Sequence, residues 1–377
     1  MNVERTVEQL REMQAMSLEE KILLAQGRIE RWYYHFHGNV YVSFSGGKDS
    51  TVLLHIAREM FPDVPAVFIN TGLEYPEIRA FAMSFDNVRE LYPVWGRAAR
   101  KHGKTPSDRI TFRDVLTIYG YPLISKSVSN VIVESRRTKH GSRWDRLHGL
   151  YGQRDDGKKS CYDHSRYLPL YDLPIRISDE CCKVNKKSPA QRYETMTGNK
   201  PIIATMTEES NMRESAWLSS GCNAFESHRP VSKPMSFWLE QDVLQYIVEN
   251  NIEISSVYGD VCVQDESKNL YTPSFMCSGK LVCSGCQRTG CMFCSFGAHL
   301  EKGMTRYQRL KITHPKVYEY CIGGGAWIEN DRYDPAKTAS DDWNPKHIWV
   351  PSKGGLGFGK VFDMLNSIYG NEFIRYE

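Results

Sequence analysis

The sequence lacks several features that would place it in a class at once. No stretch is apolar for about eighteen residues, and residues 1–20 are polar, so nothing predicts a membrane span or a secretion signal. The formal net charge is only +3, which favours no particular partner. No internal repeat and no low-complexity segment is present. We therefore expect a cytoplasmic globular protein that does not bind membranes.

A disulfide framework is also missing. The eleven cysteines are odd in number and clustered, and without a secretion signal this pattern indicates metal binding or thiol chemistry. The densest cluster has the spacing Cys283-x2-Cys286-x4-Cys291-x2-Cys294. Tetrahedral zinc and a [4Fe-4S] cluster both accept four thiolates, so the spacing predicts a metal without identifying it.

What is present is a succession of strand and helix patterns. Residues 39–44 alternate as a β-strand, a glycine-rich turn follows, and residues 50–57 continue as a helix. A second buried strand at 66–70 precedes the start of a helix at 76–82. Repeated units of this kind predict an α/β fold with a doubly wound parallel sheet.

The pattern predicts three successive regions. A helical segment covers residues 1–38, a nucleotide-binding domain covers 39–255, and a cysteine-rich metal-binding module covers 256–377. Within the second region, residues 136–159 lose apolar periodicity and carry many basic residues and aromatic rings. We expect a surface loop there, which in nucleic-acid-binding proteins would track a phosphate backbone.

The turn after the first strand is Ser45-Gly46-Gly47-Lys48-Asp49-Ser50. Glycines there let backbone amides turn inward, and the following helix adds the partial positive charge of its N-terminus, so the turn is expected to bind phosphates. The Walker pattern is absent, so transfer of a γ-phosphoryl group is not predicted. Lys48 would neutralise a leaving pyrophosphate and Asp49 would help to hold Mg²⁺.

This loop resembles that of the PP-loop ATP pyrophosphatases, which have the adenine nucleotide α-hydrolase-like fold. Three further segments resemble the phosphoadenosine phosphosulfate (PAPS) reductase family within that superfamily. They are Asn70-Thr71-Gly72 with Glu74, then Glu180-Cys181-Cys182-Lys183, and Glu208-Glu209-Ser210-Asn211-Met212-Arg213. Retention of Lys48 and Asp49 resembles the ATP-using members, among them the DNA phosphorothioation ATPases.

The resemblance implies a set of site residues. Lys48, Asp49, Cys182 and Arg213 are the expected catalytic residues. The expected adenine-nucleotide ligands are Ser45, Gly46, Gly47, Lys48, Asp49, Ser50, Asn70, Thr71, Gly72, Glu74, Glu209, Ser210 and Arg213. Apart from the resemblance, Lys126, which follows Gly120-Tyr121-Pro122 in the segment Ser125-Lys126-Ser127, is expected to face the same site. ATP and Mg²⁺ are the expected ligands of this site.

The resemblance also favours a [4Fe-4S] cluster over structural zinc. Two ligand sets stay open. The first is Cys283, Cys286, Cys291 and Cys294, which leaves Cys182 free as a nucleophile or persulfide carrier. In the second, Cys181 and Cys182 join Cys291 and Cys294, and Cys182 becomes a ligand.

Three functions follow as hypotheses. The leading one is adenylation of an acceptor by ATP with release of pyrophosphate, followed by iron-sulfur-assisted sulfur transfer. The second is a PAPS or APS reductase that releases sulfite, although residues 370–377 lack the Glu-Cys-Gly-like motif of those reductases. The third is a non-catalytic subunit that binds nucleotide or nucleic acid. A sulfur-donor protein such as a cysteine desulfurase, a nucleic-acid substrate and a homodimer are the partners we consider.

Overall fold

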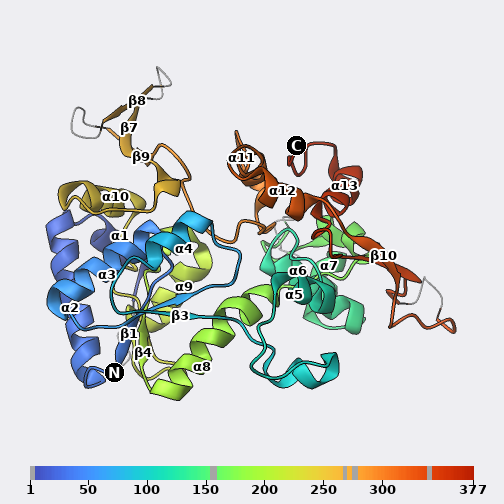
Figure 1. Ribbon diagram of the computed structural model, residues 1–377, viewed down its shortest axis with the longest axis horizontal. Helices are drawn as coiled ribbons and strands as arrows, with labels where there is room; N and C mark the ends of the chain where they lie inside the picture. The colour runs from blue at the N-terminus through green and yellow to red at the C-terminus, as the bar shows by residue number, and fades with distance from the viewer. Residues whose placement is uncertain (1–4, 153–158, 266–269, 274–278, 338–341) are drawn as a thin grey trace. The chain divides into compact units, whose positions relative to one another are not determined.

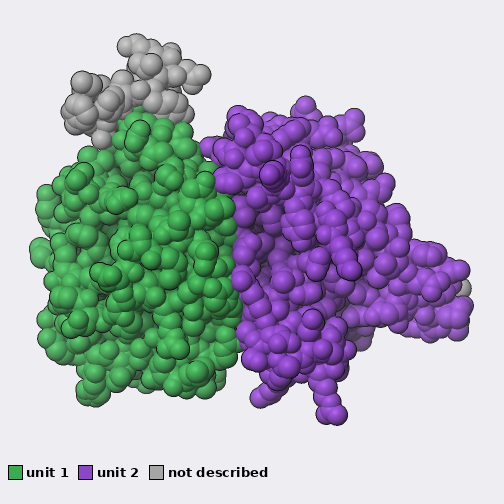
Figure 2. Space-filling model, viewed as in Figure 1, with its two compact units in different colours: residues 1–70, 74–92, 189–290 green, residues 71–73, 93–188, 291–377 purple. Residues whose placement is uncertain are grey.

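The computed structural model describes residues 5–152, 159–265, 270–273, 279–337 and 342–377 (Figure 1). The chain forms two compact units, coloured separately in Figure 2. Unit 1 comprises Met1–Asn70, Glu74–Tyr92 and Pro189–Gly290, and unit 2 comprises Thr71–Leu73, Pro93–Ser188 and Cys291–Glu377. These units differ from the predicted boundaries at residues 38 and 255. Composition along the chain does not reveal that a segment leaves one unit and later returns to it.

Unit 1 contains a six-stranded sheet in the order β3-β2-β1-β4-β6-β5, parallel except for the β5–β6 pair. Its strands are β1 (Val40–Ser43), β2 (Ala66–Ile69), β3 (Val88–Leu91), β4 (Lys200–Ile202), β5 (Asn223–Ala224) and β6 (Val231–Ser232). The predicted parallel α/β fold is confirmed. A second, antiparallel sheet is formed by β7 (Val261–Asp265), β8 (Leu270–Pro273) and β9 (Leu281–Cys283).

Strand β1 lies in the middle of the large sheet, with β2 on one side and β4 on the other. Val40, Tyr41 and Val42 are all buried, as expected for a parallel strand covered on both faces. The strand order changes direction at β1. In open α/β sheets, ligands bind beyond the carboxyl ends of the strands at such a point. The loop that follows β1 therefore occupies the position where a nucleotide site is expected.

Helices surround the sheet of unit 1. They are α1 (Val7–Gln14), α2 (Leu18–His35), α3 (Lys48–Met60), α4 (Pro76–Ala82), α8 (Ser188–Thr197), α9 (Asn211–Ser220) and α10 (Glu240–Glu249), with short turns η4 (Thr207–Glu209) and η5 (Ser256–Tyr258). The segment predicted as helical, residues 1–38, contains two separate helices, α1 and α2. Ser17 caps α2 in a capping box with Glu20, which starts a new helix at that point.

Unit 2 is mainly helical. Its elements are η1 (Gly96–His102), α5 (Phe112–Tyr119), α6 (Lys126–Arg137), α7 (Ser142–His148), η2 (Ser165–Asp172), the π-helix η3 (Lys183–Lys187), η6 (Ala298–Leu300), α11 (Arg306–Thr313), α12 (Pro315–Ile322), β10 (Ala326–Glu329), β11 (His347–Val350) and α13 (Phe358–Tyr369). None of the described helices, in either unit, is long and apolar enough to cross a membrane. The cytoplasmic location stays a prediction.

The segment predicted as a basic loop, 136–159, is largely helical where it is described, because it includes the end of α6 and all of α7; residues 153–158 lie outside the described part. Arg136 is a structural residue. Its guanidinium donates to the carbonyl oxygens of Leu170, Tyr171, Leu173 and Ile175, at 2.7 to 3.1 Å. Burial lowers the pKa of Arg136 to about 9. This charge satisfies carbonyl oxygens at the end of η2 and just beyond it.

Candidate functional site

The loop after β1 has the backbone that its glycines predict. Gly46 has a φ of +71°, and a Cβ there would lie 2.9 Å from the carbonyl oxygen of Ile78. Gly47 is the N-cap of α3. The Ser50 hydroxyl donates to the Gly47 carbonyl at 2.8 Å and accepts from the Ser45 amide at 3.1 Å. The hydrogen bonds of Ser45 and Ser50 thus hold the turn together at the N-terminus of α3. The N-terminus of a helix presents backbone amides that can bind an anion.

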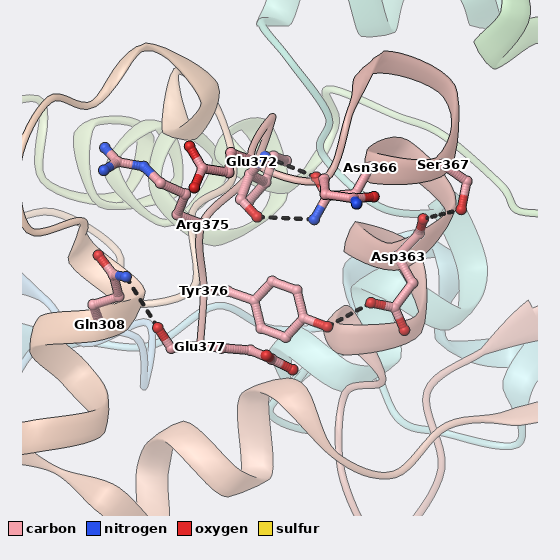
Figure 3. Close-up of a pocket in the computed structure, with 10 residues that line it drawn as sticks. Gln308, Asp363, Asn366, Ser367, Glu372, Arg375, Tyr376 and Glu377 are labelled. Carbon is pink, nitrogen blue, oxygen red and sulfur yellow. Dashed lines mark hydrogen bonds between the residues drawn. The ribbon is translucent and has the colours of Figure 1, made fainter.

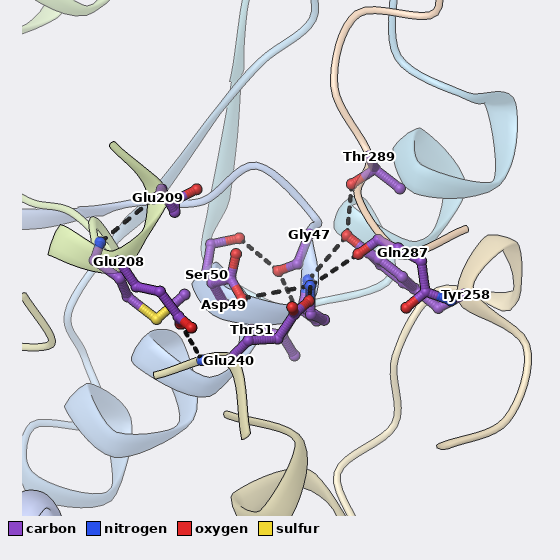
Figure 4. A network of polar contacts seen from close by, with 12 residues as sticks. Gly47, Asp49, Ser50, Thr51, Glu208, Glu209, Glu240, Tyr258, Gln287 and Thr289 are labelled. Atoms are coloured by element: carbon purple, nitrogen blue, oxygen red, sulfur yellow. Dashed lines mark hydrogen bonds and ion pairs between the residues drawn. The ribbon is translucent and has the colours of Figure 1, made fainter. Parts of the chain in front are cut away.

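Lys48 is buried at the start of α3, and its charge is held by acceptors of unit 1 (Figure 4). The ammonium lies 3.0 Å from Glu240 Oε1, 3.0 Å from the Gln287 carbonyl oxygen and 3.8 Å from Asp49 Oδ1. Its backbone amide donates to the Tyr258 hydroxyl at 3.2 Å. The hydroxyls of Tyr258 and Thr289 are 2.5 Å apart. Protein acceptors therefore contact both the ammonium and the backbone amide of Lys48, the groups predicted to bind phosphate.

These groups surround a cavity of about 90 Å³. Its lining includes five predicted residues, namely Ser45, Gly47, Lys48, Asp49 and Glu209. It also includes five residues that the sequence reasoning missed, namely Met206, Glu240, Tyr258, Arg288 and Thr289. No motif marks the latter five, because they come from η4, α10, η5 and the segment after β9 and meet only through folding.

The charges around the cavity influence one another. Burial would lower the pKa of Lys48, but the carboxylates of Asp49 and Glu240 outweigh it, and the pKa of Lys48 is raised. For Asp49, burial raises the pKa, Lys48 lowers it and Glu240 raises it, with a net increase. Within the described part of the chain, the buried Asp49 Oδ1 atom accepts no hydrogen bond. A carboxylate in this condition favours a cation close by.

Arg213 and Glu209 form an ion pair one helical turn apart at the start of α9. Burial lowers the pKa of Arg213, with contributions from Arg288, which lowers it further, and Asp49, which raises it. Arg213 is therefore within electrostatic range of Asp49 in the loop. Ser210 is the N-cap of α9, and its side chain makes no cap hydrogen bond.

The predicted Asn70-Thr71-Gly72 segment follows β2. The Asn70 side chain donates to Glu90 Oε1 at 2.7 Å. Gly72 has a φ of +76°, which favours glycine, and the Thr71 hydroxyl accepts from the Leu73 amide at 3.2 Å. Asn70 and Glu74 belong to unit 1, whereas residues 71–73 belong to unit 2.

A second group of predicted residues gathers in unit 2. The pKa of Cys181 is raised by its hydrogen bond with Cys182, by burial and by the nearby thiols of Cys291 and Cys294. The hydrogen bond from Cys181, together with Lys126 and Lys186, lowers the pKa of Cys182 to about 6 against the effect of burial. Lys126 thus lies close to the Cys182 thiol. It belongs to unit 2, whereas the phosphate loop belongs to unit 1.

One of these four thiols, that of Cys182, lies at the start of an unusual helix. Cys182 is the N-cap of the π-helix η3, a rare element that is frequent at functional sites. Cys283 and Cys286, the other half of the first predicted ligand set, belong to unit 1. Cys277 lies outside the described residues. Among described residues, no three His, Cys, Asp or Glu side chains are arranged to hold a metal ion. The donor chemistry of four thiols nevertheless suits a [4Fe-4S] cluster or zinc.

Unit 2 also contains a polar cavity of about 500 Å³ between α11, α13 and the last residues (Figure 3). Its side chains mainly satisfy one another. Tyr376 points its hydroxyl at Asp363, 2.5 Å away, and the Asn366 amide exchanges hydrogen bonds with the backbone of Ile374. This cavity contains none of the predicted site residues.

Known proteins resemble the first part of the chain. Residues 39–97, which include β1, the phosphate loop and β2, match the model of the phosphoadenosine phosphosulfate reductase domain. The resemblance to that domain, inferred from the sequence motifs, is thus supported over this part of the chain. Phosphoadenosine 5'-phosphosulfate reductases of Xanthomonas axonopodis pv. citri (strain 306) and Xanthomonas euvesicatoria pv. vesicatoria (strain 85-10) are each 29% identical to this chain over 100 residues.

These likenesses are limited in extent. The alignments cover 25% of this chain and 42% of each PAPS reductase relative. A solved structure of PAPS reductase from Candida auris, a phosphate complex, has a TM-score of 0.32 and 16% identity, covering 68% of this chain and 92% of that chain. This structural likeness is too low to carry an argument. The resemblance to PAPS reductases thus rests on the sequence matches, and the chain spans less than half the length of these curated relatives.

Proposed function

We propose that this PAPS reductase-family protein cleaves ATP between the α and β phosphates and adenylates an acceptor, which then receives sulfur. The observation that carries the proposal is the intact loop, with Lys48 and Asp49 at the N-terminus of α3 and at the switch point of the sheet. A β,γ-pyrophosphate needs such a cationic, amide-rich cradle. A sulfonucleotide contains no β,γ-pyrophosphate, so it would not need this phosphate-binding loop.

In this reaction an acceptor oxygen attacks the α-phosphorus, the bond to the bridging oxygen breaks, and pyrophosphate leaves with the electron pair. The chain's own residues bind and orient the nucleotide. Lys48 and the amides of the loop stabilise the charge that develops on pyrophosphate. Arg213, paired with Glu209 beside the cavity, supplies further positive charge and a planar donor group for phosphate oxygens. A sulfur nucleophile then displaces AMP from the adenylated acceptor.

For the metal centre, Cys181, Cys182, Cys291 and Cys294 are the residues that we propose as ligands. Support comes from their mutual effects on pKa within unit 2, in contrast to the first set, which divides between the two units. A [4Fe-4S] cluster held there would supply a site for binding and delivering sulfur. Zinc stays the alternative metal.

A sulfonucleotide reductase is the second candidate function. Two observations favour it: the matched relatives are named PAPS reductases, and the pKa of Cys182, at about 6, would make this thiol a nucleophile near neutral pH. In that reaction the Cys182 thiolate would attack the sulfur of the sulfonucleotide, and the nucleotide phosphate would leave. A thiol of a reducing protein would then attack the Cys182 sulfur, releasing sulfite and forming a disulfide.

One set of assays separates the two functions. Protein purified without oxygen would be analysed for iron and acid-labile sulfide, then for pyrophosphate release from ATP and sulfite release from PAPS and APS. Exchange of labelled pyrophosphate into ATP, measured with candidate nucleobase, DNA and small-molecule acceptors, would detect adenylation. Exchange that depends on an acceptor supports the leading proposal. Sulfite release without any ATP requirement would replace it by the reductase.

A further inference from the structure

The ammonium of Lys48 lies between two carboxylates, and this arrangement is unusual for a phosphate-binding lysine. Glu240 Oε1 is 3.0 Å away and Asp49 Oδ1 is 3.8 Å away, the second being too far for a hydrogen bond. Asp49 Oδ1 is buried and accepts no hydrogen bond from the residues that the structure describes. The Lys48 ammonium therefore places a positive charge between the two carboxylates, but it is within hydrogen-bond distance of Glu240 only.

The charges of the residues that line the cavity also favour a bound cation there. Its lining holds two cationic side chains, Lys48 and Arg288, and three anionic ones, Asp49, Glu209 and Glu240. Arg213 offsets Glu209, which leaves the carboxylates of Asp49 and Glu240 facing the cavity with the cations of Lys48 and Arg288. A bare polyphosphate entering this site would meet two carboxylates at short range. A divalent cation that bridges carboxylates and phosphate oxygens removes that repulsion, and Mg²⁺ is commonly bound in this way.

The position of Glu240 is fixed by its helix. Glu240 is the first residue of α10, and its amide donates to Glu208 Oε2 at 2.7 Å. The preceding amide, that of Leu239, donates to Asp242 at 2.6 Å. Asp242 is in turn held by Lys21, with the ammonium 2.7 Å from Oδ2. The start of α10 is thus anchored from two sides, and the Glu240 carboxylate projects from a rigid element toward the loop.

We propose that Glu240, together with Asp49, provides the protein ligands of a divalent cation that accompanies the nucleotide, and that Lys48 holds this cation position when the site is empty. The inference rests on the proposed function in one respect, that a polyphosphate binds at this loop. On nucleotide binding the Lys48 ammonium turns from the carboxylates to the phosphates, and the cation takes its place. Glu240 is then a metal ligand and not simply an ion-pair partner of Lys48.

Two variants test this proposal by direct metal binding. Mn²⁺ would be used as the probe and followed by electron paramagnetic resonance, with a non-hydrolysable ATP analogue present or absent. Glu240→Gln is expected to weaken Mn²⁺ binding in the analogue complex by about tenfold or more, on the scale seen when groups around a metal are lost. Binding of the analogue without metal should be unchanged or stronger, because a negative charge has been removed.

The matched control is Glu249→Gln at the other end of α10, where the carboxylate accepts only an exposed hydrogen bond from Gln245. It should bind Mn²⁺ like the wild type. Equal loss of analogue affinity in Glu240→Gln with and without metal would overturn the proposal, because Glu240 would then act only through Lys48. Unchanged Mn²⁺ affinity in Glu240→Gln would overturn it as well.

Lys48→Met separates this proposal from the proposed function. Removal of the ammonium should let Asp49 and Glu240 bind Mn²⁺ without any nucleotide more tightly than the wild type does, and the added substitution Glu240→Gln should abolish that gain. Circular dichroism would verify that each variant folds. A gain in Lys48→Met with no nucleotide binding by the wild type would support the cation site and contradict the nucleotide assignment. No gain in a folded Lys48→Met protein would overturn the cation site itself.

Discussion

Lys48 carries the largest expected effect of any single residue. It is the buried cation of the phosphate loop, so its removal should leave the charge on a departing pyrophosphate without its main partner. We expect Lys48→Ala to slow pyrophosphate release by about 100- to 1,000-fold, as for the loss of one preorganised donor. Steady-state assays of pyrophosphate would measure this. Lys302→Ala, at an exposed position of unit 2, is the control, and equal rates in the two variants would contradict the site.

Glu90 gives a prediction about acid stability. Burial would raise its pKa, but hydrogen bonds from Arg79, Tyr92 and Asn70 outweigh this and lower the pKa of Glu90 to about 2. The folded pKa is below the unfolded value of about 4.3, so the carboxylate stabilises the fold above that pH and loses its contribution as the pH falls toward 2. Glu90→Gln should therefore lower stability at neutral pH and flatten the decline between about pH 5 and 2.

Urea unfolding at a series of pH values would measure this effect. Glu249→Gln, whose carboxylate is exposed and far from these donors in the chain, should keep the wild-type slope. A Glu90→Gln protein with the same acid dependence as the wild type would show that this carboxylate is not held as described. Because Asn70 is one of its donors, the same experiment examines whether the end of β2 depends on Glu90.

At the scale of elements, helix α10 is attached to α2 by one buried ion pair. The Lys21 ammonium lies 2.8 and 2.7 Å from the two Asp242 oxygens, and the side chains are 2% and 12% exposed. Lys21→Met leaves the Asp242 charge buried without its partner, which should cost about 3–5 kcal/mol in the free energy of unfolding. Chemical denaturation would measure the loss.

The double variant Lys21→Met, Asp242→Asn should recover much of that stability, because no unpaired charge remains and Asn still accepts a hydrogen bond at the start of α10. Additive losses in the double variant would contradict a buried pair. Since Asp242 also accepts from the Leu239 amide, the single variant is expected to loosen the first turn of α10, and with it Glu240.

For the whole molecule, the main question is which thiols hold metal. Cys283 and Cys286 belong to unit 1, and Cys181, Cys182, Cys291 and Cys294 all belong to unit 2. We expect Cys291→Ser with Cys294→Ser to abolish iron content and visible absorbance in protein purified without oxygen. Cys283→Ser with Cys286→Ser should retain both. Loss of iron in the latter variant would restore the first ligand set, and zinc in place of iron would make the centre structural.

Much of the nucleotide half could be predicted from the sequence because its signals are local. A β-rich run, two glycines and an apolar helix pattern follow one another without interruption, so β1, the loop and α3 were predictable within a few residues. The helix at 76–82 has the same bounds as α4. The break between α1 and α2 was missed, although Ser17 and Glu20 form a capping-box signal for it.

The sequence by itself determined the local chemistry of this protein: a glycine turn that exposes amides, a lysine and an aspartate at a helix start, and clustered thiols. Only the tertiary structure decided which groups meet. Glu240, Tyr258 and Thr289 lie about 190 to 240 residues beyond Lys48 in the chain, and no periodicity connects them to the loop. The division of the cysteines between two units was likewise invisible, because spacing along a chain does not show where the chain crosses from one compact unit to the other.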